Sequence, residues 1–243
     1  RRIPGLFLLG EQNRLGIAQE VAGIFPGFHH SVLFGKRDRS EGGLRIGNSA
    51  GLSTAKESGD LMKSYVALLY SIVLGPGRRV IMADLRAVAE ALGYRDATTI
   101  GASGNLLFQA HPAPLGEFEA ALEAGFAARF GKSVDIILRD AESWRRLAAG
   151  NPFPEAAARD GARVHVRVMR QPAGSGDLAR LAAYASGGEE LRIVDGDLWM
   201  HFADRLPSEG KLLGQLTAKR SGVGTVRNWN TVARIAAALK EGG

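Results

Sequence analysis

The chain has 243 residues, of which 45% are hydrophobic and 23% are charged, the composition of an ordinary globular protein. It contains no cysteine, which excludes a disulfide framework, a thiolate zinc site and a cysteine nucleophile, and favours a reducing, cytoplasmic environment. The net charge of +6 is spread along the chain, so it permits an anionic partner without indicating one.

Residues 1–61 lack the regular spacing of apolar side chains that helices and strands require. They hold 11 of the 32 glycines and show no sustained period, apart from a possible short helix near residues 17–24. An ordered segment of about 60 residues usually shows a pattern. We therefore expect this N-terminal segment to be irregular or disordered.

A regular pattern begins at Met62. Residues 65–69 are apolar at every position, which predicts a central strand covered on both faces. Apolar residues at helical spacing predict two helices, near 85–92 and 115–126, and further strands are predicted at 97–100, 105–108 and 134–138. The order is β-α-β-β-α-β, which is that of the ferredoxin-like fold.

A similar order of elements recurs in the second half. A linking helix at 141–149 is followed by a strand at 164–168 and a helix at 178–185. Asp195-Gly196 predicts a tight hairpin between strands 191–194 and 198–202, and helices are predicted at 211–219 and 228–239. We therefore expect an α+β protein of two decorated ferredoxin-like halves, residues 62–139 and 140–243, related by structural duplication.

Residues 62–243 resemble the domain-of-unknown-function 1697 family of bacterial proteins. The resemblance is carried, in family order, by Tyr65-Val66-Ala67-Leu68-Leu69, Met82-Ala83-Asp84-Leu85-Arg86, Ser103-Gly104-Asn105, Asn151-Pro152-Phe153, Lys211-Leu212 and Arg227-Asn228-Trp229-Asn230-Thr231-Val232. It implies two ferredoxin-like halves and no established activity. Because it begins at Met62, we expect residues 1–61 to be translated upstream sequence; a genuine flexible extension is the alternative.

This chain departs from the usual pattern of that family in three places. Tyr70-Ser71-Ile72-Val73 stands where an arginine-glycine-isoleucine-asparagine stretch is common. Ala102 stands where a glutamine commonly precedes the Ser103 turn, and Gly210 where a serine commonly precedes Lys211. These departures remove polar groups from plausible site positions.

The segment Arg227-Asn228-Trp229-Asn230, at the start of the last helix, is the strongest candidate site. A helix N-terminus attracts anions, to which Arg227 would add a guanidinium fork and Trp229 a stacking face. The structural alternative is that Thr225 or Asn228 caps the helix and Trp229 is buried with Val232. We expect Arg227→Ala to cost little stability, and Trp229→Ala to cost about 3–5 kcal/mol as a core truncation.

Three other places could contribute to a ligand site. Ser103 and Asn105 flank Gly104 in a turn that could bind a ligand or be only a well-formed turn. Arg78 and Arg79 follow a glycine-containing loop that lacks the complete phosphate-binding motif. Lys211 would add a positive charge.

Several common kinds of site are not indicated. The histidines have no metal-ligand spacing, so we expect neither a metal nor a cofactor. Arg163, His165 and Arg167 share one face of a strand, which we interpret as a solvated edge. The longest apolar run, about residues 65–74, is shorter than the roughly 20 residues that cross a bilayer, so we expect no membrane partner.

These observations favour a non-enzymatic binding module for a small anionic ligand or a nucleic-acid end. An enzyme of unrecognised type, acting on a phosphorylated or carboxylated metabolite, is the second hypothesis. A structural or protein-interaction module is the third.

Overall fold

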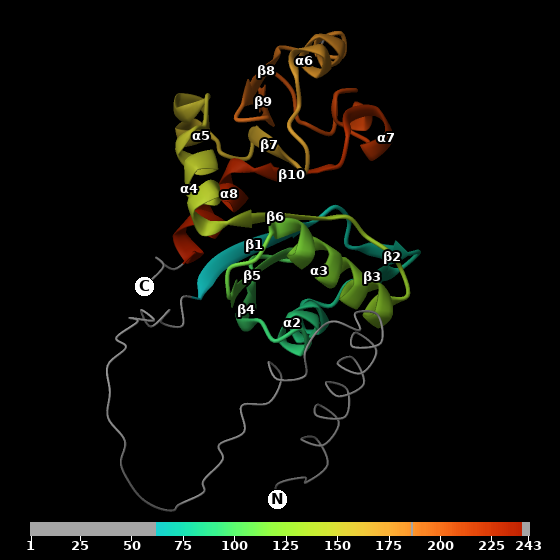
Figure 1. The fold of residues 1–243 in the computed structure, drawn as a ribbon. Coiled ribbons are helices and arrows are strands. Elements are labelled where there is room, and N and C mark those ends of the chain that lie inside the picture. Colours follow the sequence, from blue (N-terminus) through green and yellow to red (C-terminus); the bar gives the residue numbers. More distant parts are fainter. Residues whose placement is uncertain (1–61, 186, 240–243) are drawn as a thin grey trace, which may run out of the picture.

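The computed structural model describes residues 62–185 and 187–239, and the expectations for residues 1–61 lie outside this range. The described chain forms two four-stranded antiparallel sheets with helices around them (Figure 1). The α+β class predicted from the sequence is therefore confirmed. Within the described residues, no helix combines the length and the apolarity that crossing a membrane requires.

The first sheet has the strand order β4-β5-β1-β6, with every neighbouring pair antiparallel. A two-stranded hairpin, β2 and β3, follows β1 before the first helix. The elements of this unit are β1 (Lys63–Leu69), β2 (Val73–Gly75), β3 (Arg78–Arg79), α2 (Met82–Ala91), β4 (Arg95–Thr99), β5 (Asn105–Ala110), α3 (Leu115–Phe130) and β6 (Ile136–Asp140).

The second sheet has the order β10-β7-β9-β8 and is also antiparallel. Its hairpin turns at Asp195 and Gly196, both with positive φ, as the sequence predicts. The elements of this unit are α4 (Ala141–Ala149), α5 (Pro154–Arg159), β7 (Val164–Met169), α6 (Ser175–Ala182), β8 (Glu189–Val194), β9 (Asp197–Phe202), the 3₁₀ turn η2 (Leu213–Gln215), α7 (Ala218–Ser221), β10 (Gly224–Asn228) and α8 (Trp229–Ala238).

In the second half, one sequence-based prediction is wrong and one strand was not predicted. The helix predicted at 211–219 is only η2 and the four-residue α7. The sequence did not predict β10, because its five residues end in the helix-capping group of α8 and are too few to show an alternation. The strand is held by pairing with β7, a partner more than 50 residues away, and local propensity does not reveal such pairing.

Strand β1 is buried on both faces, as its composition predicts. Tyr65, Ala67 and Leu69 belong to a core formed with α2 and α3. Val66 and Leu68 belong to a second core that includes valines of β7 and apolar residues of α4 and α8. The first sheet is thus enclosed between its own helices and the second half of the chain.

Candidate functional site

Arg227 joins the two sheets at the carboxyl end of β1. Its side chain reaches out of β10 and is 7% exposed. The Nε atom donates to Oδ1 of Asn105 over 2.5 Å, and Nη2 donates to the carbonyls of Leu69 (3.1 Å) and Ser103 (3.0 Å). Nη1 donates to the Thr225 hydroxyl (2.7 Å) and the Val226 carbonyl (2.8 Å).

These contacts occupy all five N–H groups of the guanidinium. Every acceptor is uncharged, and no carboxylate among the described residues pairs with Arg227. Burial lowers the pKa of Arg227 to about 10, because the charged form loses its hydration. Three residues of the predicted site are therefore together: Arg227 and Asn105 are buried, and the exposed Ser103 takes part through its backbone carbonyl. The guanidinium is saturated by these internal hydrogen bonds.

The rest of the predicted segment begins α8. Asn228 is its N-cap and accepts from the Thr231 backbone N–H at 3.0 Å. Trp229 is half-buried, with its ring 6.3 Å from that of Trp199. Asn230 is exposed and lies against Gly161. The capping and packing roles considered for Asn228 and Trp229 are thus present.

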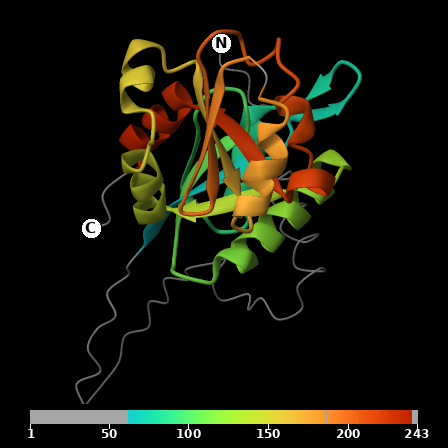
Figure 2. The same ribbon diagram turned by 90° about the horizontal axis from the view of Figure 1, so that it is seen from above.

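The remaining predicted site residues are exposed. Arg78 and Arg79 form β3, in the hairpin that projects from the body of the molecule (Figure 2). Lys211 precedes η2 and is exposed as well. None of these three residues shares a hydrogen bond with Arg227.

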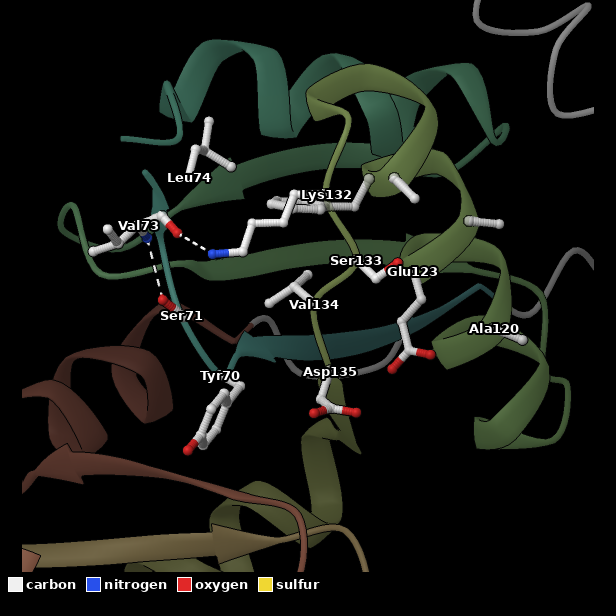
Figure 3. A pocket seen from close by; sticks show the side chains of 13 residues that line it. Tyr70, Ser71, Val73, Leu74, Ala120, Glu123, Lys132, Ser133, Val134 and Asp135 are labelled. Carbon is white, nitrogen blue, oxygen red and sulfur yellow. Dashed lines mark hydrogen bonds between the residues drawn. The ribbon is translucent and has the colours of Figure 1, made fainter. Parts of the chain in front are cut away.

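A cavity of about 730 Å³ is lined in part by the chain that follows Leu69, from Tyr70 to Leu74 (Figure 3). It is bounded by one side of α3, by the α3–β6 loop and by the chain that follows β1. Apolar side chains make up much of its wall: Val73, Leu74, Ala120, Ala124, Phe126, Ala127 and Val134. Polar groups of Tyr70, Ser71, Glu123, Lys132, Ser133 and Asp135 complete it.

The two carboxylates of this cavity are held by an arginine from the other half of the molecule. Arg170, which follows β7, pairs with Glu123, with Glu119 (3.5 Å) and with Asp135 (3.6 Å). It also donates to the Ile136 carbonyl at 2.6 Å. The position of the acidic wall therefore depends on contacts between the halves.

Lys132 crosses the cavity from the α3–β6 loop to the hairpin (Figure 3). Its Nζ atom donates to the Val73 carbonyl over 2.6 Å, on the exposed side of the cavity. This contact fastens β2 to the loop that precedes β6.

The Arg227 network and the cavity share one stretch of chain. The Leu69 carbonyl accepts from Arg227, and the Tyr70 backbone N–H donates to the Asp135 carbonyl at 2.9 Å. Ser71 and Val73, immediately beyond, line the cavity. Arg227 thus positions a cavity wall without reaching the cavity.

The cavity was not predicted from the sequence. One feature of the sequence coincides with it: Tyr70, Ser71 and Val73, which line the cavity, belong to a stretch that departs from the usual family pattern. The other walls come from residues 120–135, more than 45 positions further on. No local motif connects these two stretches.

The interpretation of Arg163, His165 and Arg167 as a solvated edge is wrong. Arg167 is 1% exposed and donates to the carbonyls of Ser221 (2.9 Å) and Gly222 (2.7 Å). Burial lowers the pKa of His165, which is half-buried against Phe202. The strand is central in its sheet, and α6 and the segment containing η2 and α7 cover this face.

Among residues 62–185 and 187–239, no group of three or more His, Asp or Glu side chains is arranged to hold a metal ion. The geometry offers hydrogen bonds, charges and apolar surface to a small molecule.

Comparisons with known proteins agree with this fold. The described structure is similar to that of the conserved bacterial protein SP0830 from Streptococcus pneumoniae, with a TM-score of 0.57 and 24% sequence identity over 74% of this chain and 99% of that one. No curated protein matches the chain. The family described as "Protein of unknown function (DUF1697)" matches residues 62–199, which is more than half of the sequence. The chain therefore belongs to the DUF1697 family.

Proposed function

We propose that this protein is a binding module for a small molecule, which occupies the cavity between α3, the α3–β6 loop and residues 70–74. The volume of about 730 Å³ lies within the range of cavities that enclose metabolite-sized ligands. The observation that carries the proposal is the combination of an apolar wall with a small set of converging polar groups.

The charges of the cavity favour a ligand with an apolar body and a cationic group. Glu123 accepts the Ile136 N–H and an Arg170 N–H through Oε1 alone, so Oε2 accepts no hydrogen bond from the described residues. Asp135 lies close by and points to the same side of the cavity (Figure 3). An ammonium group would pair with these carboxylate oxygens, although Arg170 and Lys132 offset part of their negative charge.

A small anionic ligand or a nucleic-acid end, the class favoured by the sequence, has weaker support. The Arg227 donors on which it relied are occupied inside the molecule. Lys211, Arg78 and Arg79 are exposed, and none of them lines the cavity of Figure 3. The test below therefore includes anions as the alternative class of ligand.

The test uses thermal shift and calorimetry with hexylamine, hexanol, hexanoate, inorganic phosphate and a short RNA. Binding to the native state raises its melting temperature. Ala120→Leu fills the cavity from an exposed helix position, and Glu123→Gln removes a charge while keeping an oxygen for the Ile136 N–H. Ala179→Leu, an exposed position on α6 outside the cavity, is the matched control.

We expect hexylamine to stabilise the wild type and the control variant. Ala120→Leu should abolish that effect, and Glu123→Gln should weaken binding about tenfold, which corresponds to roughly 1.4 kcal/mol. If hexylamine binds Ala120→Leu and the wild type equally well, its binding site is not this cavity. If phosphate or RNA stabilises the protein and hexylamine does not, the ligand is an anion, and the proposal of a cationic ligand is wrong.

We also infer that the two halves are a structural duplication. Each sheet has the spatial order fourth-first-third-second when its strands are numbered along its own half. This is the order of a β-α-β-β-α-β unit, with α2 and α3 as the crossover helices of the first half and α6 as the first crossover of the second. The short η2 and α7 segments stand where the second half would have its other crossover helix.

A further inference from the structure

A second cavity, of about 320 Å³, lies at the junction of the two halves and is separate from the cavity of Figure 3. One of its sides is formed by the end of β6 and the first turns of α4. The β8–β9 turn forms another side. Polar and aromatic residues of its lining include Arg139, Ser143, Arg146, Asp195, Asp197 and Trp199.

The α4 side of this junction cleft carries positive charge and a hydroxyl. Arg146 has a side chain that is 59% exposed, and it pairs with Glu142 at 2.5 Å. It also donates to Oγ of Ser143 at 2.9 Å. The Ser143 hydroxyl also hydrogen-bonds the Asp140 carboxylate, so its proton is directed toward Asp140.

The β8–β9 side carries negative charge. Asp197 is 6% exposed, and its Oδ1 accepts from the Met169 N–H (2.7 Å) and from Arg139 (3.3 Å). No described residue donates to its Oδ2. Asp195 is exposed at the hairpin turn next to it, with a φ of 49°. Two carboxylates therefore face the cleft from one hairpin.

Apolar surface also lines the cleft, next to the Arg139–Asp197 ion pair that joins its two sides. The buried ring of Trp199 lines the cleft together with Leu147 and Val194. A ligand with a single charge would satisfy one side and be repelled by the other. A ligand with both charges and an apolar part would match all three surfaces.

We propose that the junction cleft binds a small zwitterion of the amino-acid type. Its carboxylate lies toward Arg146, its ammonium group lies toward Asp195 and Asp197, and its side chain lies on Trp199. A guanidinium group is suited to a carboxylate, and carboxylate oxygens are suited to an ammonium group. The volume of about 320 Å³ is at the small end of ligand cavities, in keeping with a molecule of this size.

The test is calorimetry on the full chain with glycine, norleucine, glutamate and arginine, followed by two truncated analogues. Hexanoate lacks the ammonium group of norleucine, and pentylamine lacks its carboxylate. Arg146→Gln and Asp195→Asn each remove one charge at an exposed position, and asparagine tolerates the left-handed conformation of residue 195. Arg192→Gln, an exposed residue of β8 outside the cleft, is the matched control.

We expect at least one of the amino acids to bind the wild type and Arg192→Gln. Binding should weaken about tenfold or more in each of Arg146→Gln and Asp195→Asn, and both analogues should bind at least about tenfold more weakly than norleucine. The proposal is overturned if no zwitterion binds at concentrations up to about 10 mM, or if binding survives unchanged in both charge variants. Equal binding of either analogue would also overturn it.

This proposal fails or succeeds independently of the first cavity. Ala120→Leu alters the wall of the Figure 3 cavity and no residue that lines the junction cleft, so it should leave zwitterion binding unchanged. Loss of zwitterion binding in Ala120→Leu would show that the zwitterion occupies the Figure 3 cavity, and would contradict the proposal.

Discussion

The Nε atom of Arg227 donates to Oδ1 of Asn105 over 2.5 Å, although the two residues are 122 positions apart and belong to different sheets. The amide nitrogen of Asn105 in turn donates to the Ile100 carbonyl (2.8 Å) and to the Ser103 hydroxyl (3.2 Å). Arg227 therefore stabilises the turn before β5 and the end of β1 together, and with them one wall of the cavity of Figure 3.

Replacement of Arg227 by methionine should lower the free energy of unfolding by about 2–4 kcal/mol. The change leaves Oδ1 of Asn105 and the Ser103 carbonyl without the Arg227 donor, whereas the Leu69 carbonyl keeps the Thr225 hydroxyl. An unsatisfied buried group costs about 1–3 kcal/mol, partly offset by removal of a buried charge. The sequence-based expectation of little cost assumed an accessible arginine, and the burial of Arg227 reverses it. Urea denaturation measures the effect. Arg234→Ala, an exposed change in α8, should stay within about 0.5 kcal/mol of wild type.

Gly104 should tolerate alanine much less well than Gly101 in the same turn. Both have positive φ, 74° and 66°, so both substitutions carry left-handed backbone strain of about 1–2 kcal/mol. A Cβ on Gly104 would also lie 2.8 Å from Cβ of Leu69, whereas a Cβ on Gly101 would meet nothing within 4 Å. Gly104→Ala should therefore cost about 1–3 kcal/mol more than Gly101→Ala in paired denaturation curves. Equal costs would mean that the contact with β1 is looser than described.

Trp144→Ala should cost more than Trp229→Ala. Trp144 is fully buried, and its indole N–H donates to the Val232 carbonyl at 3.3 Å, so the truncation should cost about 3–5 kcal/mol. Trp229 is only half-buried at the start of α8 and should cost about 1–3 kcal/mol, below the value expected from the sequence. Thermal unfolding of the two variants side by side gives the order, and the reverse order would contradict the packing of α4 on α8.

Acidification should destabilise the protein partly through His165. Burial lowers the pKa of His165 below the ordinary value of 6.5, so the unfolded chain takes up this proton before the folded chain does. The contribution of His165 to stability is therefore complete above pH 6.5 and is lost as the pH falls from 6.5 toward the lower folded pKa. The melting temperature should fall less between pH 7.5 and pH 5.5 in His165→Gln than in wild type. The other histidines are common to both proteins and cancel in the difference; identical pH profiles would show that His165 is accessible to protons.

The features that the sequence could predict are those determined by neighbouring residues. The apolar residues of β1 predict burial on both faces of the strand, and Asp195-Gly196 predicts a tight hairpin. Neither prediction depends on residues far away in the sequence. The role of Arg227 depends on acceptors that are 122 to 158 positions away in the sequence. The local sequence shows only an arginine beside a helix N-cap, which could equally be exposed and bind an anion. Strand β10 and the cavity at Tyr70 also depend on such distant partners.

The most direct test of the central claim is to titrate isotopically labelled protein with hexylamine and to follow the backbone amide signals by nuclear magnetic resonance. If the ligand cavity is the one in Figure 3, saturable shifts should appear at Ser71, Ser133, Val134 and Asp135, and they should be absent from the Ala120→Leu variant. The account would be contradicted if the shifts were confined to other parts of the chain, or if no saturable shift appeared up to about 10 mM hexylamine.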